Sequence, residues 1–273
     1  MAAPESAARS PGPSDEPGAP TEGMITIRHV AGTTRPAYNR IYAGAGIRHA
    51  DLFSDRVLAL LAARPGMRLL DVACGEAQLL RRAAELGLEA HGVDLSDVAL
   101  RTGKHAAATA RDLGLAVANG ERLPYPDGHF DLVTNMGSLE HYEDPVRGAA
   151  EMARVLAPGG KVALHVPNTF GLRWAVMHAW RHGEVHDDGQ PIQRYGTRAQ
   201  WTRLLEAGGL HVEQVIGYED MAHWPGGVRA LATALRHPTR LLVPLSRWLP
   251  ADMASMLLFV CTADARPKRG GEA

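Results

Sequence analysis

A glycine and an acidic residue at a fixed spacing are the residues of this sequence best suited to binding a nucleoside. An apolar run that contains Leu69, Leu70 and Val72 is typical of a buried strand, and a turn at Gly75 separates it from an amphipathic helical pattern. Glycine at such a turn lets the backbone approach a ligand closely. Asp94 ends the next strand pattern, 19 residues after Gly75, which is the spacing at which a carboxylate reaches the ribose hydroxyls of a nucleoside.

The charges at the turn indicate which nucleoside is bound. A phosphate-binding loop adds a lysine, whereas this turn carries Asp71 and Glu76. Carboxylates repel phosphate groups, but they suit a cationic ligand that has an amino group and a sulfonium centre. A ribose acceptor without a phosphate-binding loop therefore predicts S-adenosylmethionine as the cofactor. The acidic turn also argues against an NAD-dependent oxidoreductase.

Five segments extend this pattern along the chain. They are, in order, Asp71–Ala77, Gly92–Ser96, Asn119–Val133, Leu139–Pro145 and Arg154–Gly160. Together they resemble the successive motifs of class I S-adenosylmethionine-dependent methyltransferases, and they are most similar to the type 11 branch, which includes the quinone-biosynthesis methyltransferases. The resemblance covers about residues 66–168 strongly and the flanks weakly. It departs at Ala77, where the family has a third glycine, and at Asn119, where the family has an acid.

The resemblance implies which residues hold the cofactor and which act on the acceptor of the methyl group. The expected cofactor-binding residues are Asp71, Ala73, Gly75, Asp94, Leu95, Asn119, Gly120 and Met136. His141 follows the fourth strand near the expected methyl group, and histidine suits general base catalysis because its pKa lies near neutrality. The alternative interpretation, that His141 packs beside the next helix and bonds to backbone, stays open.

Aromatic and polar residues outside the motifs are candidates for contacting the acceptor. They are Tyr38, Tyr42, His186, Tyr195 and Trp224. The two tyrosines lie in an entry segment at residues 24–49 that folds over the cofactor as a lid in the resembled family, although packing on the core is an open alternative. The histidines near residues 165–223 show no ligand pattern supported by carboxylates, so no metal site is predicted.

The alternation of strand and helix patterns predicts the fold class. Five strand patterns, the fifth at residues 161–166, alternate with helical patterns, which predicts an α/β fold with a parallel sheet and helices on both faces. Two later strands at 211–218 and 256–263 complete a Rossmann-like, seven-stranded, mostly parallel sheet, and the resemblance implies that the last strand is antiparallel. Thr197 and Gln200 form a capping box that predicts a helix start.

The remaining segments are expected to be insertions and tails. Residues 169–195 and 219–255 are expected to be helical insertions that cover the acceptor site, with short helices around 228–236 and 239–248 in the second. The predicted domain limits are a disordered tail at 1–22, a lid and first helix at 23–64, the methyltransferase domain at 65–263 and a disordered tail at 264–273.

Composition excludes several classes of protein. A net charge of −1 over 273 residues argues against a general nucleic-acid binder. No run of 18 apolar residues is present, so no membrane span is predicted, although a weak membrane-surface contact by the second insertion stays open. Cys74 and Cys261 fall on or beside strand patterns and are expected to be reduced and buried, which favours a cytoplasmic protein.

The sequence thus predicts a methyltransferase that acts on a small, partly apolar metabolite, with oxygen favoured over nitrogen or carbon as the methylated atom. The alternative is a non-catalytic protein that binds S-adenosylmethionine on the same scaffold, because fold alone does not prove activity. The identity of the acceptor and the oligomeric state do not follow from the sequence.

Overall fold

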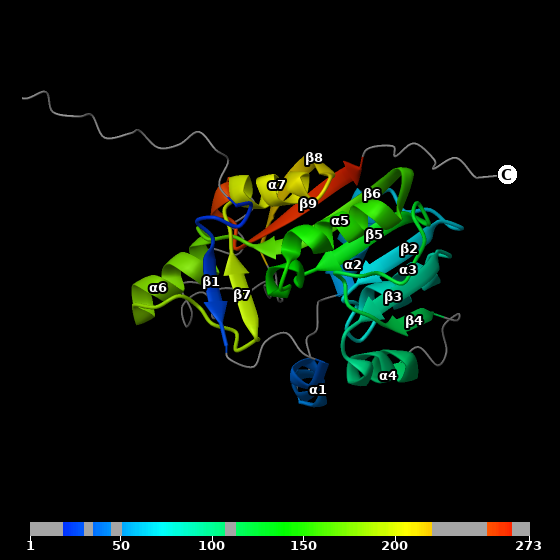
Figure 1. The fold of residues 1–273 in the computed structure, drawn as a ribbon, viewed down its shortest axis with the longest axis horizontal. Helices are drawn as coiled ribbons and strands as arrows, with labels where there is room; N and C mark the ends of the chain where they lie inside the picture. The colour runs from blue at the N-terminus through cyan, green and yellow to red at the C-terminus, as the bar shows by residue number, and fades with distance from the viewer. Residues whose placement is uncertain (1–18, 30–34, 45–50, 107–112, 220–249, 264–273) are drawn as a thin grey trace, which may run out of the picture.

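A seven-stranded sheet forms the centre of the molecule in a computed structural model that describes residues 19–29, 35–44, 51–106, 113–219 and 250–263 (Figure 1). The strand order is β4-β3-β2-β5-β6-β9-β8. The strands are β2 (Arg68–Val72), β3 (Glu89–Asp94), β4 (Gly114–Val117), β5 (Phe130–Met136), β6 (Leu156–Pro167), β8 (Leu210–Tyr218) and β9 (Met256–Ala263). Strand β9 runs antiparallel to both of its neighbours, and β2 to β6 are parallel, which confirms the predicted fold class.

Helices cover both faces of this sheet. On one face, a core cluster joins the sheet to α2 (Asp51–Leu60), α3 (Gln78–Glu85) and α4 (Asp97–Ala106). On the other face, a second cluster joins it to α5 (Pro145–Val155) and α7 (Arg198–Ala207). Trp201 of α7 is fully buried there, and its indole N–H donates a hydrogen bond of 2.9 Å to the carbonyl of Pro167 at the end of β6. This bond satisfies the polar atom of a large apolar side chain, as burial of tryptophan requires.

Local sequence signals explain where these helices begin. The predicted capping box of α7 is confirmed, because the Thr197 hydroxyl accepts from the Gln200 N–H and the Gln200 side chain accepts from the Thr197 N–H. Helix α5 has Pro145 in its first turn and the Asp144 carboxylate accepts from the backbone N–H of Arg147.

Strand β6 starts five residues earlier than predicted. Leu156 pairs with Phe130 of β5, and the pairing then shifts register before Leu132 meets Lys161. The extra residues of β6, which include Gly159 at a φ of 77°, form an irregularity of the bulge type. The sequence interpretation treated this Pro-Gly-Gly segment as a turn before the strand, because a bulge and a turn use the same residue types.

A separate two-stranded sheet was not predicted. Strand β1 (Ile25–Arg28) pairs antiparallel with β7 (Ile192–Tyr195), so part of the entry segment lies beside part of the first insertion (Figure 1). Each strand has only four residues, and the buried positions of β7 include Gln193 and Arg194. Buried polar residues hide the hydrophobic alternation on which strand prediction depends.

The first insertion contains η2 (Leu172–Val176) and α6 (Met177–His182), and its role as a cover of the acceptor site stays a prediction. Helix α6 buries none of its residues. Trp180 is 82% exposed. The predicted helices within the second insertion, the C-terminal tail and most of the N-terminal tail lie outside the described residues.

Arg154 of α5 fixes the loop that follows β4. Its guanidinium donates hydrogen bonds to the backbone carbonyls of Leu123 and Tyr125, and to the carboxylates of Asp127 and Glu151, at 2.7 to 3.1 Å. The planar fork of arginine is suited to several such bonds at once.

We therefore expect Arg154→Lys to lower the free energy of unfolding by about 2–3 kcal/mol, because lysine keeps the charge but loses most of the hydrogen bonds. Urea unfolding followed by circular dichroism measures this. Arg198→Lys is the matched control, since Arg198 pairs with Asp252 at an exposed site and should change stability little. Equal effects of the two changes would contradict the role given to Arg154.

Candidate active site

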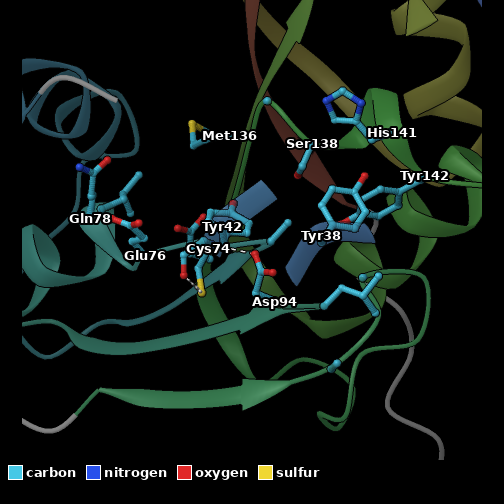
Figure 2. Close-up of a pocket in the computed structure, with 18 of the residues that line it drawn as sticks. Tyr38, Tyr42, Cys74, Glu76, Gln78, Asp94, Met136, Ser138, His141 and Tyr142 are labelled. Carbon is cyan, nitrogen blue, oxygen red and sulfur yellow. Dashed lines mark hydrogen bonds between the residues drawn. The ribbon is translucent and has the colours of Figure 1, made fainter. Parts of the chain in front are cut away.

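A pocket lies at the carboxyl edge of the sheet, where β2, β3 and β5 end. It encloses about 1010 Å³, including the volume that is open to solvent at its mouth. Figure 2 shows Asp94 and Tyr42 in its middle, with Gln78 on one side and His141 on the other. This is the edge at which sheets of this type bind ligands.

The turn after β2 has an unusual backbone. Ala73, Gly75 and Ala77 all have positive φ values, of 62°, 52° and 58°. Alanine rarely adopts this conformation, so the surrounding bonds must hold it in place. The N–H of Gly75 donates to Oδ2 of Asp94 at 2.8 Å, and the N–H of Cys74 donates to the carbonyl of Val93 at 2.9 Å. The end of β3 therefore holds the turn open toward the pocket.

Asp94 is buried and well suited to bind ribose hydroxyls. Its Oδ1 accepts from the backbone N–H of Ser96 at 2.7 Å, and its Oδ2 accepts from Gly75. Burial raises the pKa of Asp94, while these backbone bonds oppose the increase. The carboxylate has about four lone pairs in all, so these backbone bonds leave acceptor capacity for a ligand hydroxyl.

Asp71 places a second buried carboxyl in the pocket. The Thr134 hydroxyl donates to Oδ1 of Asp71 at 2.7 Å. Burial raises the pKa of Asp71 to about 7, with a further contribution from Asp94. The described residues that line the pocket include no lysine or arginine to offset these acids. A cationic ligand would supply the missing positive charge, so the site fits S-adenosylmethionine.

Helix α1 (Arg35–Ala43) closes the pocket over the turn. Asn39 donates to Oδ1 of Asp97 at 2.9 Å and accepts from the Ser96 hydroxyl at 2.7 Å, which fixes α1 to the start of α4. Tyr42 thereby lies over Gly75, because a Cβ added to Gly75 would be only 2.8 Å from the Tyr42 hydroxyl oxygen. Tyr38 also lines the pocket, and burial raises the pKa of both tyrosines. Both predicted contact tyrosines thus face the site.

The loop after β4 forms the wall expected to contact adenine. Asn119 lines the pocket, and its Oδ1 accepts from the backbone N–H of Glu121 at 2.9 Å. One lone pair of that oxygen is left for an adenine amino group. Gly120 lies against Tyr142, and a Cβ at Gly120 would collide with the tyrosine hydroxyl. Tyr142 also accepts a hydrogen bond of 3.2 Å from the Asn135 side chain.

His141 lines the pocket from η1 (Leu139–His141) and is itself buried. Its Nδ1 contacts the carbonyl of Ile192, and since a carbonyl only accepts, Nδ1 carries the proton in the neutral ring. Its Nε2 then carries the lone pair, and it lies 3.8 Å from Oε1 of Glu140 and 3.9 Å from Oδ2 of Asp188. Burial lowers the pKa of His141 and raises that of Glu140 to about 8. The backbone bond and the pocket-facing position coexist, so both sequence interpretations describe part of the geometry.

The remaining predicted residues do not all reach the pocket. Its lining includes every predicted cofactor residue: Asp71, Ala73, Gly75, Asp94, Leu95, Asn119, Gly120 and Met136. His186 and Tyr195 bond to each other, through a contact of 3.2 Å between Nδ1 and the tyrosine oxygen, and lie outside the lining. Trp224 lies outside the described residues.

Several lining residues were not among the predicted site residues, although the sequence analysis had noted the acid at Glu76 and the thiol at Cys74. They are Phe53, Ser54, Cys74, Glu76, Gln78, Leu79, Ala118, Glu121, Gly137, Ser138, Tyr142 and Gln190. Four of the twelve, Cys74, Glu76, Glu121 and Tyr142, lie within the recognised motifs, and five more lie within two residues of one, so proximity to the motif residues was an available signal. Phe53, Ser54 and Gln190 come from segments with no motif, and only the fold brings them here. Cys74 is buried, which raises its thiol pKa, in agreement with the structural role predicted for it.

The described residues hold no cluster of three or more His, Cys, Asp or Glu side chains that could bind a metal ion. Within the same residues, none of the helices is both long and apolar enough to cross a membrane.

Comparison with known proteins agrees with this geometry. Residues 70–164 match the family model of a methyltransferase domain. The demethylmenaquinone methyltransferase of Listeria monocytogenes is 32% identical over 133 residues, which are 47% of this chain and 56% of the relative. The ubiquinone/menaquinone biosynthesis C-methyltransferase of Shewanella piezotolerans is 37% identical over 108 residues, which are 37% of this chain and 43% of the relative. The chain therefore spans about half the length of the curated relatives it matches.

Solved structures show the same fold at low sequence identity. An S-adenosylmethionine-dependent methyltransferase of Mesorhizobium loti has a TM-score of 0.55 and 20% identity, with 81% of this chain and 99% of that chain covered. The [4+2]-cyclase SpnF has a TM-score of 0.60 and 21% identity, with 85% and 93% covered. The geranyl diphosphate C-methyltransferase of Streptomyces coelicolor, solved with S-adenosyl-L-homocysteine, has a TM-score of 0.55 and 17% identity, with 78% and 79% covered. Residues 70–164 are therefore similar to a methyltransferase domain, and the described chain shares its fold with these solved structures.

Proposed function

We propose that this protein transfers a methyl group from S-adenosylmethionine to a small, partly apolar acceptor. The observation that supports this best is a single pocket that joins Asp71, Gly75 and Asp94 to His141. A binding protein needs the first three residues, but it does not need a buried histidine on the same cavity. The names of the relatives support the same activity.

The residues of the chain have separate tasks in this proposal. The bound cofactor supplies a methyl group that its sulfonium centre has already activated. Asp94 binds the ribose, while Asp71 balances the positive charge of the ligand. Tyr38 and Tyr42 exclude water from the pocket, which strengthens the electrostatic interactions inside it. His141 removes a proton from the acceptor at Nε2, since Nδ1 is engaged with backbone.

The charges that line the pocket limit the class of acceptor. Among the described residues that line the pocket, the ionisable groups are His141, three tyrosines, a buried thiol and four carboxyl groups. The carboxyl groups belong to Asp71, Glu76, Asp94 and Glu121. Besides the sulfonium centre of the cofactor, an acceptor with a phosphate or carboxylate would find no cationic side chain among the described lining residues to pair with. We therefore propose a neutral acceptor with an ionisable O–H or C–H bond.

The methylated atom is the finer part of the proposal. The sequence analysis favoured oxygen, whereas the name of the Shewanella relative specifies methylation of carbon. A base at His141 serves both, because a hydroxyl and an acidic carbon each lose a proton on methylation. We propose carbon first, with demethylmenaquinone as the first acceptor to test, and oxygen as the alternative. Product analysis by mass spectrometry and NMR distinguishes the two.

A non-catalytic protein that binds S-adenosylmethionine is the second candidate. The likeness to a [4+2]-cyclase shows that proteins with this fold are not confined to methyl transfer. Calorimetric binding of S-adenosylmethionine without methyl release to any tested acceptor would favour this candidate. A cytoplasmic location remains part of the proposal, and it is supported by Cys74 and Cys261, which are buried and form no disulfide.

Asp94→Ala should weaken binding of S-adenosylhomocysteine roughly 10- to 100-fold, because it removes a charged acceptor for the ribose hydroxyls. Isothermal titration calorimetry measures the affinity, and thermal unfolding shows whether the variant is folded. Asp55→Ala is the control, since Asp55 pairs with Arg82 on the surface between α2 and α3. A folded Asp94→Ala protein with unchanged affinity would mean that the ribose lies elsewhere.

Cofactor affinity should rise between pH 6 and pH 8. Asp71 has a pKa of about 7 without ligand, so its carboxyl is mostly protonated at the lower pH and mostly ionised at the higher. The ionised form attracts a cationic ligand, and this linkage should tighten binding of S-adenosylmethionine about 3- to 10-fold over that range. Calorimetry at pH 6, 7 and 8 tests this. Asp71→Asn should flatten the dependence, and an equally steep dependence in that variant would assign it to another group.

His141→Gln should lower turnover by about 10²- to 10⁴-fold at nearly unchanged cofactor affinity, because it removes the proton acceptor and leaves the cofactor residues intact. Turnover with demethylmenaquinone and calorimetric affinity are measured on the same preparation. His178→Gln is the control, since His178 lies on α6 outside the pocket. Near-normal turnover of the His141 variant would leave alignment of the acceptor as the main source of catalysis.

A further inference from the structure

We propose that Asp188 is a positioning residue for His141. The carboxylate of Asp188 faces Nε2 of His141 and stabilises the imidazolium that forms when His141 takes a proton from the acceptor. This inference rests on the proposed function, because it assumes that His141 is the base. Neither the sequence motifs nor the cofactor site includes Asp188. It lies in the segment between α6 and β7. This segment carries no recognised sequence motif.

The orientation of the ring is the first observation. Nδ1 of His141 contacts the carbonyl of Ile192, at the start of β7. That bond directs Nε2 toward Oδ2 of Asp188, at 3.9 Å. A separation of this size is longer than a direct hydrogen bond, but it is within the range in which an opposite charge favours the protonated ring.

The second observation is that the carboxylate of Asp188 is held in place. The backbone N–H of Gln190 donates to its Oδ1 at 2.9 Å, and the Gln190 side chain donates to its Oδ2 at 3.0 Å. Gln190 itself lines the pocket. The neighbouring Asp187 pairs with His29, at 3.1 Å, just beyond β1. The segment is therefore fixed both to the pocket and to the two-stranded sheet.

The third observation concerns the other groups around the imidazole. Glu140 is as close as Asp188, but burial raises its pKa to about 8, so near neutral pH it is mostly an uncharged acid. Arg194 of β7 opposes a positive charge on the ring. Tyr38 on α1 and Tyr195 on β7 interact with both Glu140 and Asp188, and His165 on β6 lies with Glu140 beside Gly137. Asp188 thus supplies the negative charge that favours protonation at Nε2.

The chemical step that this arrangement assists is a proton transfer. The bond between the acceptor atom and its hydrogen breaks, and an N–H bond forms at Nε2 of His141. The electron pair stays on the acceptor atom, which becomes the nucleophile. The imidazole then carries a positive charge that lies beside the Asp188 carboxylate, whereas without this carboxylate the charge would face Arg194 in a buried site.

The experiment follows the titration of His141 by NMR in the ligand-free full-length protein, with the imidazole signal assigned by its loss in His141→Gln. Asp188→Asn removes the charge at nearly constant shape. We expect its His141 titration midpoint to lie about one pH unit lower than in the unchanged protein. Asp188→Glu keeps the negative charge, so its His141 titration midpoint should lie close to that of the unchanged protein. Asp187→Asn is the matched control, because Asp187 pairs with His29 and should leave His141 unaffected.

A His141 midpoint that is the same in the unchanged and Asp188→Asn proteins would overturn the proposal. An equal displacement in Asp187→Asn would overturn it too, because the effect would then be one of net charge or loop structure. The measurement needs neither cofactor nor acceptor. Failure of the protein to bind S-adenosylmethionine therefore counts against the proposed function, whereas an unmoved midpoint counts against the role of Asp188.

Discussion

The carboxylate of Asp94 is the interaction on which the rest of the site depends. It accepts backbone N–H groups from Gly75 in the turn after β2 and from Ser96 at the end of β3. One side chain thus joins two neighbouring strands at the edge where the ligand is expected. Ser96 in turn donates to Asn39 of α1, so the position of the helix that closes the pocket also depends on this point. A change at Asp94 is therefore expected to act on the turn and on α1 as well as on the proposed contact with the ribose.

Buried acids give this site its electrostatic character. Asp71 and Asp94 are both buried, and burial raises the pKa of each. Without ligand, burying two negative charges is unfavourable, and protonation of a carboxyl group lowers this cost. A cationic ligand removes that need, because it supplies the opposite charge inside the pocket. The same property underlies the proposal that the acceptor is neutral.

The fold and the cofactor half of the site were predictable because their signals are local. The strand before Asp71, the turn at Gly75 and the acid at Asp94 lie within one strand–helix–strand unit, and each has a pattern of its own. The pairing of β1 with β7 was missed because it joins residues that lie far apart in the sequence. The buried residues of β7, such as Arg194, are partly polar, so periodicity gave no indication of them.

The acceptor half of the site is harder to predict for a related reason. His141 follows a motif, but the groups around it come from segments that the motifs do not include: Ile192 begins β7, and Asp188 and Gln190 lie just before it. These segments are joined only by the tertiary fold, and a change in their length or sequence would leave the sheet and the cofactor turn intact. Such a division allows one scaffold to keep its methyl donor while its acceptor changes. The distinguishing chemistry of this protein is therefore expected in the segment from His186 to Tyr195 rather than in the motifs that reveal its fold.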